Sequence, residues 1–213
     1  MKKIVIALGG NALQAEGKPA TAQAQLEVVE ETAQYNADIV QQGYQVVVAH
    51  GTGPQVGRIV LQHEYAVPVP PAKPYDVCGA MRQGYIGYHL QHAIGNALAS
   101  RQKQVVTLVP QVLVDQNDHK FQNPRKPIGP FYKEEEAKAL AAERGYVMKE
   151  DAGRGWRRVV ASPMPVAIEE LDAVKCLVDN GFITVTVGGG GSPVSRNEKG
   201  ELEGTAAVID KDL

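Results

Sequence analysis

The stretch Ile4–Ala12, IVIALGGNA, predicts the first strand of the fold and the first part of a ligand site. Its apolar run stops at two glycines, which is the pattern of a buried strand, more often parallel than antiparallel. Gly9 and Gly10 have no Cβ, so their N–H groups can approach a ligand closely. Asn11 adds a neutral side-chain donor. The stretch therefore predicts a strand whose end holds a small anion.

A second apolar strand, Tyr44–Ala49, is also followed by glycines, in the sequence HGTGPQVG at His50–Gly57. Thr21 is suited to cap a helix that runs to about Gln42, between the two strands. A strand–helix–strand order of this length predicts a parallel βαβ unit. Ligands of open parallel sheets bind beyond the carboxyl ends of the strands. The candidate binding residues in this second loop are Gly51, Thr52 and Gly53.

A third glycine loop follows the predicted strand Phe182–Val187. It begins with Gly188, Gly189 and Gly190 and continues to Gly191. One glycine pair after a strand is more often a tight turn than a phosphate site. Three such loops converging on one rim favour a ligand site made mostly of backbone N–H groups.

The remaining pattern predicts further helices and strands of an α/β domain and one region of different character. Residues 115–165 are rich in polar residues and proline, so we predict a small inserted subdomain there. The predicted elements are a helix over 79–100, a strand over 104–109, a loop or hairpin over 115–125, a rigid segment over 126–131, a helix over 133–144, paired strands over 146–149 and 156–160, a helix over 168–180 and an exposed turn over 196–204.

Composition excludes several classes of function. The chain has 213 residues, 44% of them hydrophobic, which suits one globular domain. A formal net charge of −2 leaves no basic footprint for nucleic acid. No apolar run approaches the roughly 18 residues of a membrane span. Two cysteines without a CxxC indicate a reduced cytoplasmic protein. The five histidines have no firm metal-binding spacing, so we predict no protein-held metal.

Lys126 and Lys211 are the cations that would suit phosphoryl transfer, a reaction that needs positioning and positive charge more than covalent help. Lys211 lies between Asp210 and Asp212, either of which can orient it. A lone lysine is usually a solvated surface charge. From the residues alone that interpretation is favoured for Lys126, and for Lys211 the two interpretations are equally supported.

Six segments taken together resemble the carbamate kinases of the amino-acid kinase superfamily. They are ALGGNA (7–12), HGTGPQVG (50–57), NPRKPIGPFY (123–132), DAGRGWRRVVASP (151–163), GGGGSPV (188–194) and VIDKDL (208–213). The resemblance spans essentially the whole chain. It implies a three-layer αβα sandwich around a mainly parallel sheet, a protruding inserted subdomain and a homodimer. It also implies reversible phosphoryl transfer between ATP and carbamate with Mg²⁺, which usually makes ATP in arginine or agmatine catabolism.

The resemblance assigns roles to matching residues. Gly9, Gly10 and Asn11 would hold the transferring phosphoryl group, and Gly51 to Gly53 would seat carbamate or its phosphate. Lys126 would close on the phosphoryl group, and Lys211 would bridge phosphates while Asp210 and Asp212 orient cations. Relatives such as acetylglutamate kinase have a lysine two residues before the first glycines, where this chain has Ala7. Ser192 stands where an aliphatic residue is expected.

Family members continue well past the segment that matches VIDKDL, into a portion that supplies most of the nucleotide site. We therefore expect these 213 residues alone to bind adenine nucleotide poorly and to lack activity. Two alternatives stay open at this point. One is a superfamily kinase that acts on another small acid, and the other is a non-catalytic ligand-binding or regulatory module.

Overall fold

The computed structural model describes residues 2–15, 17–51, 53–67 and 69–213. Its central sheet, sheet A, contains four parallel strands in the order β1-β2-β9-β3. Their bounds are β1 Lys3–Leu8, β2 Gln45–His50, β9 Ile183–Val185 and β3 Val105–Thr107. Leu8 is in register with His50, and Val48 is in register with Val185. The three glycine loops therefore leave neighbouring strands at the same edge of the sheet.

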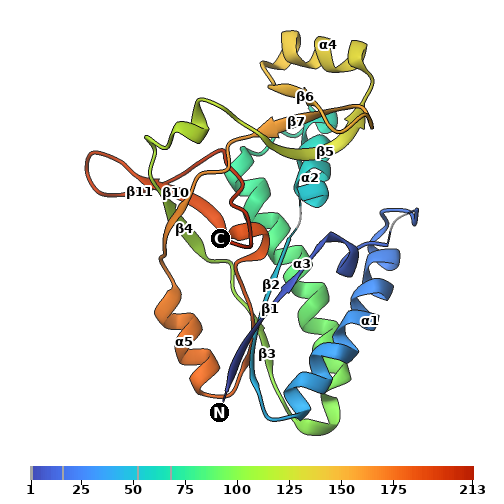
Figure 1. Ribbon diagram of the computed structural model, residues 1–213, viewed down its shortest axis with the longest axis vertical. Helices are drawn as coiled ribbons and strands as arrows, with labels where there is room; N and C mark the ends of the chain where they lie inside the picture. Colours follow the sequence, from blue (N-terminus) through green and yellow to red (C-terminus); the bar gives the residue numbers. More distant parts are fainter. Residues whose placement is uncertain (1, 16, 52, 68) are drawn as a thin grey trace.

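Helices cover both faces of sheet A, so the fold is the α/β three-layer sandwich that was predicted (Figure 1). Helices α1 (Ala22–Gln41) and α3 (Tyr75–Ala97) lie on one face, and α5 (Leu171–Asp179) lies on the other. Thr21 caps α1 as expected, because its hydroxyl accepts the Ala24 N–H at 3.2 Å. The main core between these layers consists of aliphatic side chains, among them Val29, Val48, Ile86, Leu90 and Val185.

The predicted starts of two helices were wrong, and the first of these helices ends at Ala97 instead of 100. Helix α3 begins at Tyr75 instead of 79, because Pro74 is extended and occupies the position before the first turn. Helix α5 begins at Leu171 instead of 168, because residues Pro165–Ile168 form strand β8.

A second sheet, sheet B, was not predicted. Its order is β11-β10-β4-β8, and its strands are β11 Leu202–Gly204, β10 Ser192–Arg196, β4 Gln111–Val114 and β8 Pro165–Ile168. The predicted exposed turn over 196–204 was too long, because Arg196 ends β10 and Leu202–Gly204 form β11, which leaves only 197–201 as the hairpin turn. The strands are three to five residues long and two contain proline, so their periodicity is too short to separate them from loops.

A third sheet, with strand order β5-β7-β6, lies apart from the others together with helix α4, as Figure 1 shows. The bounds are β5 Lys126–Tyr132, α4 Glu134–Arg144, β6 Met148–Glu150 and β7 Trp156–Val160. We call residues 126–160 the sheet C unit. The predicted pairing of the last two strands is confirmed by their antiparallel register. The segment expected only to be rigid, 126–131, is strand β5, and the subdomain limits of about 115 and 165 stay a prediction.

Short elements connect these layers. Helix α2 (Gly53–Ala66) follows the second glycine loop and packs against β5. The 3-10 helices are η1 Gly10–Ala12, η2 Ala99–Arg101, η3 His119–Phe121 and η4 Gly188–Gly190. The third of these occupies the predicted loop over 115–125. None of the helices in the described ranges combines the length and apolarity needed to cross a membrane.

Candidate active site

The first two glycine loops start side by side at the carboxyl edge of sheet A. Gly9 is extended, and Gly10 and Asn11 begin the short helix η1. A Cβ at Gly9 or Gly10 would have no atom of the described residues within 4 Å, which leaves room for a ligand beside this backbone. The Gly51 N–H donates to the Leu8 carbonyl oxygen at 2.8 Å. That donor therefore joins the two loops and is not free for a ligand. Gly53 begins α2, and Thr52 lies outside the described residues.

Glycine is required through the third loop for two separate reasons. The backbone has positive φ values, between 45° and 82°, at Val187 and at the glycines Gly189, Gly190 and Gly191. This region of φ disfavours residues that carry a Cβ. The space beside each loop glycine is also occupied. A Cβ at Gly188 would overlap the His50 ring, one at Gly189 the Arg82 guanidinium, one at Gly190 the Ile209 carbonyl, and one at Gly191 the Val112 side chain. The loop is therefore fixed by β2, α3, β4 and the final segment of the chain together.

Arg82 of α3 lies behind this third loop and is 1% exposed. It donates to the Gly188 carbonyl at 3.0 Å and to the Gly191 carbonyl at 3.4 Å. Burial lowers the pKa of Arg82 to about 10, which leaves the side chain cationic at neutral pH. No carboxylate among the residues that the structure describes forms an ion pair with it. A buried cation without an anionic partner is costly, and it favours an anion at the loop.

Sequence reasoning missed Arg82, although one signal was present. It lies four residues before Ile86 and eight before Leu90, on the buried stripe of α3. A charged residue on an apolar helix stripe indicates a buried partner or a site. In this case the partners are two backbone carbonyls that lie 106 and 109 residues further along the chain.

His50 ends β2 and packs against Gly188 while only 1% exposed. Burial, with a smaller contribution from the nearby Arg82 charge, lowers the pKa of His50 to about 3. The imidazole is therefore neutral at physiological pH. Its Nδ1 has no hydrogen-bond partner among the described residues. It adds shape but no charge to the wall of the third loop.

Each of the two candidate lysines pairs with an aspartate of the segment 210–212. Lys126 Nζ, at the start of β5, donates to Asp210 Oδ2 at 2.7 Å, although 84 residues separate them. This hydrogen bond is the main cause that holds the pKa of Asp210 below its usual range. Lys211 pairs with Asp212, in agreement with the prediction that a neighbouring carboxylate orients it. Lys126 is thus not the solvated surface charge that its sequence context alone favoured.

Lys211 also connects the second loop with the end of the chain. A Cβ at Gly51 would lie 3.2 Å from Lys211 Cδ and 3.3 Å from Cε, so the lysine stem passes directly beside this glycine. A cleft of about 260 Å³ opens next to Asp210 and Lys211. One wall is formed by Gly190 and Val187, and the other by apolar residues of β4 and β8 such as Val112 and Ile168. The described residues contain no group of three or more His, Cys, Asp or Glu side chains able to hold a metal.

The arrangement combines backbone glycine loops, a buried cation and two lysines at one edge of a parallel sheet, which suits binding of a phosphorylated ligand. The chain belongs to the amino acid kinase family, because the sequence profile of that family matches residues 2–213. Within the family its similarity is to carbamate kinases. The carbamate kinase of Pyrococcus furiosus is 52% identical over 219 residues, which cover 100% of this chain and 68% of that protein.

Solved structures lead to the same group. The carbamate kinase of Giardia lamblia bound to citric acid superimposes with a TM-score of 0.93 at 46% identity, over 99% of this chain and 68% of that one. The structure of the Giardia enzyme bound to AMP-PNP gives a TM-score of 0.87 at 46% identity, with 99% and 67% covered. The fold and the resemblance drawn from the sequence motifs are therefore confirmed.

Proposed function

We propose that the protein transfers a phosphoryl group reversibly between ATP and carbamate, giving ADP and carbamoyl phosphate. In the forward direction a carbamate oxygen forms a bond to the γ-phosphorus, and the bond between that phosphorus and the ADP oxygen breaks. The observation that carries this proposal is that Lys126 pairs with Asp210 and Lys211 with Asp212, while the Lys211 stem passes beside Gly51. Cations placed where charge spreads over the transferring group are the main requirement of this chemistry.

The glycine loops supply binding with little side-chain help. Gly9, Gly10 and Asn11 would hold the transferring phosphoryl group, because the open space beside the first two lets a ligand reach the backbone. The segment Gly51–Gly53 would seat carbamate, with the α2 N-terminus directed at the anion. Gly188, Gly189 and Gly190 would face the nucleotide phosphates, with Arg82 adding positive charge from behind.

Lys126 would supply the charge that Ala7 does not provide at the end of β1. It starts the sheet C unit and reaches the site across the chain to Asp210. An ammonium group has three donors, so it can hold Asp210 and a phosphoryl oxygen together. Lys211 would contact the phosphates from the opposite side, with Asp212 orienting its ammonium group.

The cleft beside Asp210 and Lys211 would take the nucleotide, since it has an apolar wall and a phosphate-facing end. The Asp210 and Asp212 carboxylates fit Mg²⁺, which prefers oxygen ligands and normally arrives with the nucleotide phosphates. When bound, that ion would neutralise phosphate charge. The AMP-PNP complex of the Giardia enzyme supports use of an adenine nucleotide.

A homodimer is part of the proposal, with α3 at the contact between subunits. Val77, Met81 and Tyr88 are exposed on α3, and a Cβ at Gly84 or Gly95 would meet open space. Gly87 has a different explanation, because a Cβ there would overlap Thr107 of β3. Light scattering after size-exclusion chromatography tests the dimer.

We further propose a cytoplasmic enzyme that makes ATP in arginine or agmatine catabolism.

The decisive experiment measures ATP formation from ADP and carbamoyl phosphate with Mg²⁺, in a luciferase-coupled assay, on this chain and on a version extended to the length of the carbamate kinases it resembles. The extended version is the one expected to be active. We expect ATP in proportion to carbamoyl phosphate, with no ATP when acetyl phosphate replaces it. Equal use of the two phosphates would move the proposal to another small-acid kinase. Absence of ATP from both versions, with folding verified and carbamoyl phosphate measurably bound, would favour the binding-module alternative.

A further inference from the structure

Helix α2 and strand β5 touch backbone to backbone. A Cβ at Gly57, in the second turn of α2, would overlap the Cα and N atoms of Gly129 in β5. Gly129 has a φ of 71°, so the strand turns at the point of contact. No side chain fits at position 57 unless β5 moves away from α2. Gly129 lies only three residues after Lys126, so such a movement would carry the lysine with it.

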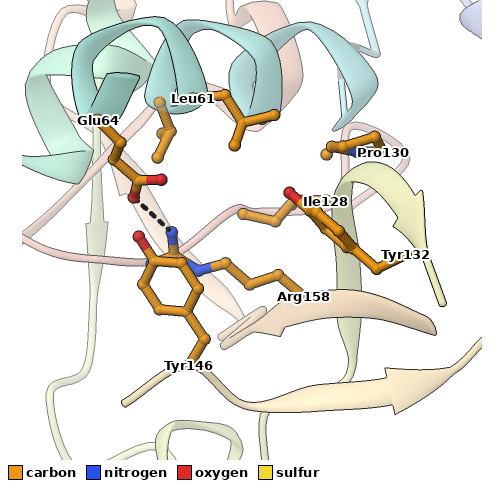
Figure 2. Close-up of a pocket in the computed structure, with 10 residues that line it drawn as sticks. Leu61, Glu64, Ile128, Pro130, Tyr132, Tyr146 and Arg158 are labelled. Carbon is orange, nitrogen blue, oxygen red and sulfur yellow. Dashed lines mark ion pairs between the residues drawn. The ribbon is translucent and has the colours of Figure 1, made fainter. Parts of the chain in front are cut away.

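A second contact joins the same helix to the sheet C unit, seven residues further along α2. Glu64 accepts a hydrogen bond from Arg144 at the end of α4, and its other oxygen lies 3.9 Å from Arg158 Nη1 of β7. Figure 2 shows Glu64 directed from the helix toward Arg158, with Tyr146 beside them. The Arg158 guanidinium lies 3.7 Å from the Tyr146 ring centroid.

These charges are well shielded from water. The Glu64 and Arg158 side chains are 15% and 21% exposed, and they line a small pocket with Leu61 and Ile128. An ion pair that is largely shielded and stacked on an aromatic ring has a defined geometry, which exposed pairs lack. Positions 57 and 64 lie on one face of α2, since seven residues make about two turns. That face therefore holds the sheet C unit at two points.

The other end of α2, its N-terminus, adjoins the proposed substrate loop at Gly51–Gly53. The helix begins at Gly53, two residues after Gly51, beside which the Lys211 stem passes. We propose that Gly57 and Glu64 are positioning residues, which set Lys126 at the distance from the Gly51 loop that phosphoryl transfer requires. This inference rests on the proposed function. Neither residue touches the reacting atoms. Gly57 acts directly on β5, and Glu64 acts through Arg158 of β7, the strand that pairs with β5.

If Gly57 and Glu64 served only to pack α2 against the sheet C unit, a different result would be expected. The core beneath this contact contains Val56, Val60, Ile128 and Val160, and a variant that only loosens it would lower the melting temperature. It would leave the placement of the sheet C unit and the turnover of the folded protein unchanged. Turnover and placement, measured on folded protein, separate the two roles.

The kinetic test compares Gly57→Ala with Gly79→Ala. Both replace a glycine inside a helix, and a Cβ at Gly79 meets nothing within 4 Å. We expect Gly57→Ala to lower kcat roughly tenfold or more, as misplacement of a catalytic group does, with KM for ADP changed little. Gly79→Ala should match the wild type. Glu64→Gln keeps shape and removes charge, and it should lower kcat several-fold if Gly57→Ala does not fold.

A second readout does not depend on activity. Nitroxide labels on the exposed Cys176 of α5 and on Glu135→Cys of α4 report the placement of the sheet C unit by pulsed electron paramagnetic resonance. Gly57→Ala and Glu64→Gln should shift or broaden the distance distribution, and Gly79→Ala should not. An unchanged distribution, or a lower melting temperature with unchanged kcat, would overturn the inference. The turnover comparison is made in the version extended to the length of the relatives. Absence of ATP formation from the wild-type extended version would refute the proposed function instead, while the distances still decide the positional claim.

Discussion

The third glycine loop and the Lys126–Asp210 pair are two halves of one site, and they are built in different ways. The loop is buried, and every one of its four glycines is enclosed by a different part of the protein. The ion pair is partly exposed, with side-chain exposures of 31% and 40%, and it joins the sheet C unit to the end of the chain. The loop has one available shape, whereas the pair depends on the placement of two separate segments.

This difference suggests that the loop and the lysine pair have separate roles, in binding and in turnover respectively. A preformed backbone loop binds charge without reorganising, which is the cheapest form of electrostatic stabilisation. A lysine on a separate unit can approach the transferring group only when that unit is correctly placed. Changes in the loop should therefore appear as lost stability, and changes in the lysine pair should appear as lost turnover with the fold retained.

The largest effect is expected from Gly190→Ala. The new Cβ would overlap the Ile209 carbonyl oxygen, and the residue would keep a φ of 82°. We expect the free energy of unfolding to fall by about 3–4 kcal/mol, combining a left-handed backbone penalty with steric overlap.

The matched control is Gly200→Ala, which has a φ of 81° and no atom within 4 Å of its Cβ. It should lose only about 1 kcal/mol, the backbone penalty alone. Urea unfolding measures both variants. Equal losses would mean that the loop has room to adjust and is not held as described.

Lys126→Met should have the opposite character. Removing the ammonium group leaves Asp210 without its ion-pair partner, yet both side chains are exposed enough to be hydrated. We expect turnover to fall roughly a hundredfold or more, as for other groups that stabilise transition-state charge, with little change in melting temperature. Steady-state ATP formation gives the turnover.

Lys138→Met is the control, since Lys138 forms an exposed ion pair with Glu134 inside α4 of the same unit. It should leave both turnover and melting temperature at wild-type values. A large loss of stability in Lys126→Met would show that the pair is structural and would break the contrast with the loop.

Parts of this comparison were visible in the sequence. Three apolar runs ending in glycine predicted the loops and their common edge, because local periodicity and the parallel βαβ rule suffice for that. Lys126 and Asp210 are 84 residues apart, and no local pattern links them. The resemblance placed both residues at the phosphoryl-transfer site, but it did not predict that they pair. Arg82 was missed for a related reason, since its partners are distant carbonyls of the loop.

The burial of His50 in the wall of the third loop predicts how the free energy of unfolding depends on pH. The unfolded chain takes up a proton on this residue below about pH 6.5, whereas the folded chain does so only near a pKa of about 3. Protons therefore bind the unfolded state more readily, and the free energy of unfolding falls as pH is lowered between these values. Relative to His50→Gln, the wild type should lose about 2 kcal/mol between pH 7 and pH 5.

The matched control is His119→Gln, because the side chain of His119 is 85% exposed. The free energy of unfolding of this variant should vary with pH as that of the wild type does, when both are measured by urea unfolding at several pH values. If His50→Gln followed the wild type as well, the imidazole would have to be protonated, or solvated, in the folded protein.

The smallest effect concerns Ser192, the residue that departs from the expected aliphatic pattern directly after the loop. Its hydroxyl accepts the Gln83 Nε2–H at 2.7 Å, and Gln83 is 1% exposed next to Arg82 on α3. Ser192→Val should cost about 1–2 kcal/mol, because a buried amide donor loses its better partner and keeps only the Pro110 carbonyl at 3.3 Å.

Gln83→Met combined with Ser192→Val should recover most of that loss, since replacing both polar partners by apolar groups is close to neutral. A double-mutant cycle from urea unfolding gives the coupling between the two residues. Coupling near zero would mean that the hydroxyl does not hold α3 to the loop. Coupling of about 1 kcal/mol would extend the rigid half of the site past Gly191 into β10, and it would explain the serine as the partner of a buried glutamine.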